Sequence, residues 1–330
     1  MTNDSEAIRF LLLKTLSAKH PQSLYEPMRE YPQRGGKGFR ATLCLTTCKA
    51  YGGNPQDARF AASAIELFGN YALVHDDIED GSLMRRGGPT LHVKFGVPLA
   101  INAGDGLLVK AWEMMIMNRT ILKVDDTLRL LDEFRKMCLN AIEGQAIELD
   151  WICRRKWGIK ENDYFEMIRK KTAWYTCIGP CRIGAIIANA QESEVEKIVD
   201  FATPMGVAYQ LQDDILNVSQ KEEIYGKEFA GDIYEGKRTL MIIRLVNLCT
   251  QQERKRIIDI MNRPREKKTT HDVNYIIELM EKYDCLTYAK TILRKLSVQS
   301  KKALKKLSLP DNQGRMELEH ILRFSTNREK

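Results

Sequence analysis

The 330-residue sequence lacks the patterns that mark β-sheet, membrane-spanning and secreted proteins. Alternating runs of Val, Ile and Thr, which are typical of strands, are essentially absent. No apolar run approaches the roughly 20 residues of a membrane span, and the first apolar stretch, residues 10–13, is far too short for a signal peptide. We also find no internal repeat and no linker long enough to divide the chain. These absences predict a single domain in the cytoplasm, without a membrane span.

The eight cysteines follow neither a metal-binding nor a disulfide pattern. Cys44 and Cys48 are four residues apart, as are Cys177 and Cys181, so each pair would lie on one face of a helix. There is no Cys-x-x-Cys motif, and no nearby histidine completes a zinc set. We therefore interpret the cysteines as small core residues of a protein in a reducing compartment.

Positive charge is in slight excess, since 51 Lys and Arg against 44 Asp and Glu give a formal net charge of +7. Much of the excess lies after Gln251, in runs such as residues 301–302 and 305–306. No basic stretch has the interleaved aromatic residues of single-strand binders. We therefore expect a solvated helix face there, with no nucleic acid as partner.

What the sequence does contain is helical periodicity, because apolar residues recur at spacings of three and four almost everywhere. Residues 58–74 carry a broad apolar stripe, and Asn54 and Pro55 supply an N-cap and a first-turn proline ahead of it. Gly or Pro marks the breaks. Similar patterns cover residues 104–117, 127–149, 163–190, 195–216, 240–248 and 273–307. The periodicity predicts an all-α, single-domain helical bundle.

Two aspartate clusters end two of these helical stretches. The first cluster, residues 76–80, reads DDIED, and the second cluster, residues 213–217, reads DDILN. Asp76 and Asp80 are four residues apart and therefore share a helix face, as do Asp213 and Asn217. Adjacent carboxylates near a core repel each other and lose solvation, so a fold keeps them there only with cations.

Facing clusters on neighbouring helices would suit Mg²⁺, which takes one or two carboxylates together with water and substrate phosphate. Two such clusters would hold a diphosphate between metal ions. The alternative is an acidic helix end capped by solvent. That alternative is credible for one cluster alone, but the two clusters and the basic residues that follow each of them favour the metal site.

Basic residues complete the pattern of a diphosphate site. Arg can bind phosphate bidentately, and a glycine loop that enters a helix offers free N–H groups to an anion. Each cation alone is more often a surface residue, so only their joint occurrence predicts binding. The cations are Lys37 and Arg40 in the loop GGKGFR, Arg85 and Arg86 after the first cluster, Lys171 in a mostly apolar helix, and Lys227 and Lys237 after the second cluster. Residues 231–237 have P-loop glycine spacing but lack the Ser or Thr that follows the lysine.

With these motifs the sequence resembles the trans-isoprenyl diphosphate synthase (polyprenyl synthetase) family over nearly its whole length. The resemblance rests on GGKGFR (35–40), LVHDDIEDGSLMRRGGPTLH (73–92), EGQ (143–145), KT (171–172), YQLQDDILN (209–217) and GKEFAGDIYEGKRTL (226–240). It implies one polyprenyl synthetase domain over residues 1–330, folded as an all-α bundle around a deep central cavity and assembled as a homodimer. It also implies a prenyltransferase that condenses isopentenyl diphosphate with allylic diphosphates and uses Mg²⁺, with three ions.

The resemblance assigns roles to individual residues. The metal ligands would be Asp76, Asp77, Asp80, Asp213 and Asp214. The allylic diphosphate would be bound by Arg85, Lys171, Thr172, Gln210, Lys227 and Lys237, and isopentenyl diphosphate by Lys37, Arg40 and Arg86. The residues expected to carry catalysis are Asp76, Asp80, Asp213, Lys171 and Arg85.

Two positions depart from the family pattern. Asn217 stands where many relatives have Asp, so the second cluster loses one charge but keeps a carbonyl oxygen. Gly69, seven residues before Asp76, stands where relatives usually carry a His or Gln that contacts isopentenyl diphosphate. Glycine removes that contact and adds flexibility within the helix.

Product length would be set ahead of the first cluster, where the growing chain is expected to run along the helix. The bulky Tyr71 and the small Ala72 lie five and four residues before Asp76 and would form a floor. This combination resembles the archaeal type of geranylgeranyl diphosphate synthase and predicts a C20 product; alternatively, Tyr71 only packs in the core.

Other functions remain possible for this sequence: a C25–C35 synthase, a class I terpene cyclase with the same metal-triggered ionisation, and a non-catalytic partner subunit. Lys37, Arg40 and Arg86 argue against a cyclase, which needs no second diphosphate site.

Overall fold

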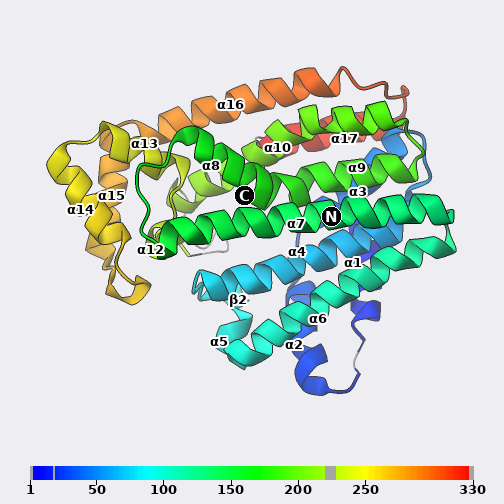
Figure 1. Ribbon diagram of the computed structural model, residues 1–330, viewed down its shortest axis with the longest axis horizontal. Coiled ribbons are helices and arrows are strands. Elements are labelled where there is room, and N and C mark those ends of the chain that lie inside the picture. Colours follow the sequence, from blue (N-terminus) through cyan, green and yellow to red (C-terminus); the bar gives the residue numbers. More distant parts are fainter. Residues whose placement is uncertain (1–2, 18, 220–227, 327–330) are drawn as a thin grey trace.

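The computed structural model describes residues 3–17, 19–219 and 228–326 and confirms the all-α prediction (Figure 1). The helices around the centre of the molecule are α3 (Phe39–Ala50), α4 (Arg59–Glu79), α6 (Val97–Ile116), α7 (Val124–Cys153), α8 (Glu161–Ile168), η3 (Arg169–Ile178), α9 (Gly179–Ile187) and α10 (Glu192–Ser219). The other helices are α1 (Asn3–Thr15), α2 (Gln22–Arg34), η1 (Pro55–Ala58), α5 (Leu91–Phe95), η2 (Met117–Thr120), α12 (Gly231–Glu235), α13 (Leu240–Leu248), α14 (Gln251–Met261), η4 (Arg265–Lys267), α15 (Thr270–Lys282), α16 (Cys285–Leu304) and α17 (Gln313–Thr326).

Strand structure in the described residues is limited to β1 (Met84–Arg85) and β2 (Gly88–Pro89), which pair antiparallel just after the first aspartate cluster. None of the described helices is long and apolar enough to cross a bilayer.

Helix α4 forms where the apolar stripe predicted it and carries the first cluster in its last turn. The Asn54 side chain accepts a hydrogen bond from the Gln56 N–H at 3.1 Å and starts η1, which leads directly into α4. The helix ends at Glu79, and the Asp80 N–H still donates to the Asp76 carbonyl. The carboxylates therefore lie at the end of α4 where the helix dipole is negative. The dipole destabilises their negative charge, so nearby cations are needed to offset it.

Two predicted stretches are interrupted. Residues 163–190 run through α8, η3 and α9, but η3 is a π-helix of ten residues. Residues 273–307 are divided between α15 and α16, because Asp284 adopts a left-handed conformation with a φ of 53°. No glycine or proline marks that break, so helical periodicity alone could not locate it.

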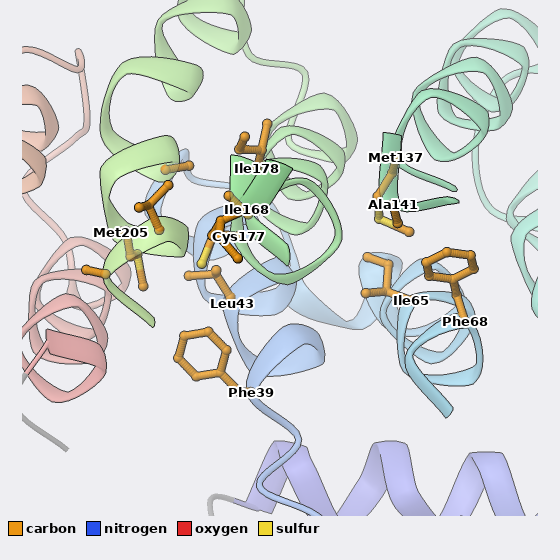
Figure 2. Close-up of a cluster of buried hydrophobic side chains, with 14 of the residues drawn as sticks. Phe39, Leu43, Ile65, Phe68, Met137, Ala141, Ile168, Cys177, Ile178 and Met205 are labelled. Atoms are coloured by element: carbon orange, nitrogen blue, oxygen red, sulfur yellow. The ribbon is translucent and has the colours of Figure 1, made fainter. Parts of the chain in front are cut away.

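The core joins these helices around one apolar cluster (Figure 2). Phe39 from α3 lies near Met205 from α10, while Phe68 from α4 lies near Met137 from α7. All four side chains are buried. Helix α10 packs on η3 and η3 packs on α7, so the ends of α4 and α10, which carry the two aspartate clusters, are held by the same core.

Candidate active site

A cavity of about 610 Å³ lies between α3, α4, α7, η3, α10 and α12. Most of the side chains that the sequence singled out line it, although they come from distant parts of the chain. Those residues are Lys37, Arg40, Tyr71, Ala72, Asp76, Arg85, Arg86, Lys171, Thr172, Gln210, Asp213, Asp214, Asn217 and Lys237. Asp77 and Asp80 are not part of the lining, and Lys227 lies outside the described residues.

Lysines from two other elements neutralise the first aspartate cluster. Lys171 of η3 lies 3.1 Å from the Asp76 carboxylate, and Lys237, just after α12, lies 2.6 Å from the Asp80 carboxylate. Burial alone would raise the pKa of Asp76, but the charges of Lys171, Lys237 and Arg85 outweigh it and hold that pKa below its ordinary value. Asp76 is therefore an anion in the folded protein.

Asp77 has a different environment from its neighbour. It is fully buried, and Arg85 donates to its Oδ1 through Nε at 2.8 Å and also through Nη2. The Tyr31 hydroxyl donates to its Oδ2. Both oxygens are thus occupied by protein donors, and the Asp77 carboxylate fixes the guanidinium that also reaches Asp76 at 3.5 Å. This arrangement suits a positioning role better than direct metal ligation.

The second aspartate cluster is arranged by neutral donors. The Tyr164 hydroxyl donates to Asp214 at 2.7 Å, and the Gln210 amide donates to the same carboxylate at 2.8 Å. The Gln210 carbonyl oxygen in turn accepts from the Thr172 hydroxyl at 2.9 Å. Burial raises the pKa of Asp214 to about 6, against the opposing effect of these hydrogen bonds. Asp213 faces the cavity beside this network.

Asn217 anchors the start of α12 to α10. Its side-chain oxygen accepts from the Asp232 N–H at 3.2 Å, and its backbone carbonyl accepts from the Ala230 N–H at 2.8 Å. The side-chain oxygen that the sequence offered as a metal ligand is therefore used to anchor α12. That short helix supplies Asp232 to the cavity lining.

The π-helix η3 brings Lys171 to the first cluster. A β-carbon on Gly144 of α7 would lie only 2.1 Å from the Lys171 backbone nitrogen, so the two helices touch backbone to backbone at this point. Glu148, one turn further along α7, accepts from the Lys171 ammonium, which also reaches Asp76. A wide π-turn is a recognised device at functional sites, and here it lies opposite a glycine.

A second cationic group lines the same cavity. Arg86 has a left-handed φ of 52°, and its guanidinium donates to the Tyr31 carbonyl at 2.7 Å and to the Asn70 side chain at 3.1 Å. Burial lowers the pKa of Arg86 to about 10. Lys37 and Arg40 lie in the same lining, near the N-terminus of α3. The buried Glu66 of α4, also in the lining, accepts from the Ala41 N–H at 3.0 Å.

The space beside Gly69 is occupied by Arg40. A β-carbon on Gly69 would lie 3.5 Å from Arg40 Cδ and 3.6 Å from its Nε. The guanidinium carbon lies 4.4 Å from the centre of the Tyr175 ring, a cation–π distance. The absence of a side chain at position 69 therefore leaves room for Arg40, which the family resemblance assigns to isopentenyl diphosphate binding.

Tyr71 and Ala72 line the cavity on α4, about one turn before Asp76. The Tyr71 ring is half-buried, 4.7 Å from the His75 ring and 5.4 Å from the Phe68 ring between centroids. Tyr71 therefore packs on the core and faces the cavity at once.

Sequence reasoning missed several residues of the site. Most are ordinary helix residues whose partners lie far away in the chain, so no local signal pointed to them. The missed residues are Tyr31, Tyr164, Glu148, Asp232 and Glu235, the last of which contacts Lys237 at 2.8 Å. The motif GDIYEGK contains Asp232 and Glu235. It was noticed as a failed P-loop and as part of the family resemblance, but no role was assigned to either acidic residue.

The donor set fits Mg²⁺ shared with a diphosphate. Carboxylate oxygens are the ligands that this cation prefers, and Asp76, Asp80, Glu148 and Glu235 gather such oxygens around Lys171 and Lys237. Burial raises the pKa of Asp80 despite the opposing charge of Lys237, so further positive charge would be needed to hold that carboxyl as an anion. No group of three acidic, His or Cys side chains in the described part of the chain is close enough to hold a metal by itself. Substrate oxygens and water would have to complete the coordination, as is usual for Mg²⁺.

The chain matches known proteins of one family. The polyprenyl synthetase family model covers residues 21–280. A geranylgeranyl diphosphate synthase of Sulfolobus acidocaldarius is 32% identical over 97% of this chain and 95% of its own length. The crystal structure of a geranylgeranyl pyrophosphate synthetase from Pyrococcus horikoshii superposes with a TM-score of 0.87 at 33% identity, covering 98% of this chain and 96% of that one.

A geranylgeranyl pyrophosphate synthase from Corynebacterium glutamicum, solved with isoprenyl diphosphate and magnesium, has a TM-score of 0.89 at 25% identity and covers all of both chains. The helical bundle and its charged cavity thus define a prenyltransferase. The chain belongs to the polyprenyl synthetase family.

Proposed function

We propose that this protein is a Mg²⁺-dependent geranylgeranyl diphosphate synthase, which condenses isopentenyl diphosphate with allylic diphosphates up to a C20 product. The observation that carries the proposal is that one cavity is lined by both aspartate clusters, by a second cationic group and by Tyr71. Two diphosphate sites and a bounded apolar space are what a chain-elongating prenyltransferase needs.

In this proposal the allylic diphosphate lies between the two aspartate clusters. Asp76, Asp80 and Asp213 hold the metal ions, three by family resemblance, and Asp77 and Asp214 position their neighbours. The relative from Corynebacterium glutamicum, solved with magnesium, supports this cofactor. When bound, Mg²⁺ would supply positive charge to the departing diphosphate. Arg85, Lys171, Thr172, Gln210, Lys227 and Lys237 would contact the same diphosphate.

Isopentenyl diphosphate would bind the second cationic group, Lys37, Arg40 and Arg86. The allylic C–O bond breaks and its electron pair leaves with pyrophosphate, whose charge Arg85 and Lys171 stabilise. The isopentenyl double bond then attacks the allylic carbon, because both substrates are held close together away from water. The new C–C bond leaves a cation that loses a proton to a pyrophosphate oxygen and so forms the new double bond.

The test is to incubate the pure protein with Mg²⁺, farnesyl diphosphate and labelled isopentenyl diphosphate. We expect label in a C20 diphosphate. Absence of incorporation would sink the synthase proposal, and an unlabelled cyclic hydrocarbon would identify a cyclase instead. Label in C25 or longer chains would retain the reaction and correct the product.

Tyr71 is the residue proposed to limit product length. Tyr71→Ala removes the ring one turn above Asp76 and should shift the product from C20 to longer chains, as chromatography of the dephosphorylated alcohols would reveal. Phe134→Leu is the matched control, since this ring is fully buried in the core and lies outside the cavity lining. An unchanged C20 product from Tyr71→Ala would remove Tyr71 from this role.

We further propose a homodimer formed through α6 and α7. Exposed apolar residues recur along one face of α7, and α6 exposes others nearby. They are Val124, Leu128, Leu139 and Ile142 on α7 and Ile101, Val109 and Ile116 on α6. Light scattering should give about twice the chain mass of 38.0 kDa. Leu128→Lys with Leu139→Lys should give the monomer, and a monomeric wild type would end this proposal.

We also propose a single domain and a cytoplasmic location. The first and last described helices support one domain, since α1 packs on α4 and α17 packs on α3. The cysteines support a reducing compartment, because all eight are free thiols. Six are buried as predicted, but Cys153 is exposed.

A further inference from the structure

The outer face of α16 carries cations and no acidic residue. The segment 285–306, which comprises α16 and the two residues after it, contains seven Lys or Arg and no Asp or Glu. At about 100° per residue, the seven fall within an arc of about 160° around the helix. All seven are exposed, and we name them the cationic face: Lys290, Arg294, Lys295, Lys301, Lys302, Lys305 and Lys306.

The cationic face accounts for the net charge of the whole protein. The chain has 51 Lys and Arg and 44 Asp and Glu, so the 44 cations outside the cationic face balance all 44 acidic residues. Within the described residues, none of the seven side chains is engaged in a hydrogen bond or ion pair. Elsewhere exposed cations commonly pair, as Lys282 does with Glu253 at 2.7 Å. The excess charge is therefore gathered on one surface.

The opposite face of α16 packs on the protein. Ala289, Leu293 and Leu304 are buried in the core, and α16 packs extensively on α10. Figure 1 shows α16 along one edge of the molecule, with α2, α5 and α6 at the opposite edge. The cationic face is thus a strip about 24 Å long, and a dimer formed through α6 would leave it accessible.

We propose that the cationic face binds the surface of anionic lipid bilayers. Clusters of four to eight Lys and Arg on one face of an amphipathic helix are a recognised feature of such binding. The half-exposed Val298 lies in the middle of the strip, where it would reach the headgroup layer. Because the apolar side of α16 is used in the core, attraction would be mainly electrostatic and therefore sensitive to salt.

A nucleic acid is the competing partner for a cationic strip. The cationic face has no aromatic side chain on which bases could stack, and it is a convex helix surface rather than a groove. A flat anionic surface is the better match, because a straight helix can present all seven charges to a plane at the same time.

The test is flotation of the full-length protein with phosphatidylcholine vesicles, with and without phosphatidylglycerol. We expect binding only to the anionic vesicles, and loss of that binding at about 1 M salt, where the Debye length falls to about 3 Å. Substrates are absent, so the result does not depend on the proposed reaction. Binding to both vesicle types alike, or to neither at low salt, would overturn the proposal.

A charge-matched pair of variants locates the binding surface. One carries Lys301→Gln, Lys302→Gln, Lys305→Gln and Lys306→Gln, and the control carries Lys14→Gln, Arg119→Gln, Lys255→Gln and Lys267→Gln at scattered exposed sites. Each cation near an anionic bilayer strengthens binding roughly fivefold, so the first variant, which loses four, should lose about 600-fold in partitioning and the control less than tenfold.

Gln suits helices about as well as Lys, so both variants should keep the wild-type unfolding temperature and enzymatic rate. Equal losses in the two variants would show that net charge alone governs binding and would overturn the assignment to α16. Tight binding of a labelled oligonucleotide that excludes vesicles would reassign the cationic face to nucleic acid.

Discussion

The ends of α4 and α10 both hold adjacent aspartates in place, but with different partners. Each carries an adjacent aspartate pair near the negative end of a helix dipole. In each pair the first aspartate lines the cavity, and the second is buried and accepts a hydrogen bond from a tyrosine hydroxyl. Tyr31 serves Asp77 and Tyr164 serves Asp214. The two clusters thus share a local arrangement, although different helices supply the tyrosines.

They differ in how charge is balanced. At the end of α4, Lys171 and Lys237 pair with Asp76 and Asp80. At the end of α10, Asp214 is held by the neutral side chains of Tyr164 and Gln210, and Asn217 carries no charge at all. The first cluster is therefore the charged partner of any bound ligand, whereas the second depends on hydrogen-bond geometry. Substitutions that remove charge should therefore lower activity more in the first cluster than in the second.

The largest expected effect is loss of the charge on Asp76. Asp76→Asn leaves Lys171 without one of its two carboxylate partners and removes a proposed metal ligand, and breaking a buried ion pair costs about 3–5 kcal/mol. We expect kcat/KM to fall by about a thousandfold. Asp214→Asn, whose partners are neutral, should cost only about tenfold.

Asp105→Asn on α6, an exposed position, controls for general effects of removing a carboxylate. Steady-state kinetics of the three variants checks the order. Equal losses in Asp76→Asn and Asp214→Asn would show that the two clusters are equivalent and that the contrast in charge has no catalytic consequence.

The next largest effect separates the two tyrosines. Tyr164→Phe leaves the buried Asp214 with the Gln210 donor, whereas Tyr31→Phe leaves Asp77 with both donors from Arg85. A lost hydrogen bond to a buried acceptor costs about 1–3 kcal/mol. We therefore expect the Mg²⁺ concentration for half-maximal rate to rise about tenfold in Tyr164→Phe and about threefold in Tyr31→Phe.

Tyr283→Phe is the control, since its hydroxyl donates to Glu253 at 2.7 Å outside the cavity lining. A Mg²⁺ titration of the rate is the measurement. If Tyr31→Phe instead raises the half-maximal Mg²⁺ concentration more than Tyr164→Phe does, then Arg85 does not compensate for the lost Tyr31 hydroxyl.

The sequence predicted the charged residues of the site, but not the tyrosines whose hydroxyls position the aspartates. The clusters, Lys171 and Lys237 were predictable because acidic pairs at helix ends are rare and require cations. Tyr31 and Tyr164 were not, because a tyrosine on an apolar helix face has the same pattern whether or not its hydroxyl meets an aspartate 46 or 50 residues away. The π-turn of η3 was hidden for a similar reason, since apolar periodicity does not distinguish it from an α-turn.

The helices were easier to predict from the sequence than the points at which they are interrupted. The stripe in residues 58–74 predicted α4 well, because local sequence and burial agree there, whereas the predicted cap at Asn54 starts η1 and not α4 itself. The break at Asp284 was missed because a non-glycine residue adopts the left-handed conformation, for which the sequence holds no signal. Asn217 was correctly noticed as unusual, but its partner, the Asp232 N–H, depends on tertiary structure.

A smaller effect should follow from charging the second cluster. Asn217→Asp keeps the oxygen that accepts from the Asp232 N–H and adds a carboxylate to the cavity lining. We expect the half-saturating Mg²⁺ concentration to fall about threefold, which is about 0.6–0.7 kcal/mol, and the two regions to become more alike. A rise in that concentration would indicate that the Asn217 amide N–H groups, and not missing charge, matter at this position.

The smallest effect concerns Gly69, which lies in the interior of α4, seven residues before Asp76. Its counterpart on α10, Gly206, lies seven residues before Asp213, but a β-carbon there would lie only 2.6 Å from Ala173 Cα. A β-carbon on Gly69 meets Arg40 Cδ at 3.5 Å, an ordinary contact, so Gly69→Ala fits without displacing the arginine. Ala favours a helix interior over Gly by about 1 kcal/mol, so the unfolding temperature should rise by about 2 °C with both KM values unchanged. Gly69→Gln must take the space that Arg40 fills and should change KM for isopentenyl diphosphate while sparing that for the allylic substrate. If Gly69→Ala alone altered KM for isopentenyl diphosphate, then Arg40 needs more room than its contact with Gly69 indicates, and the first region is sensitive to packing as well as to charge.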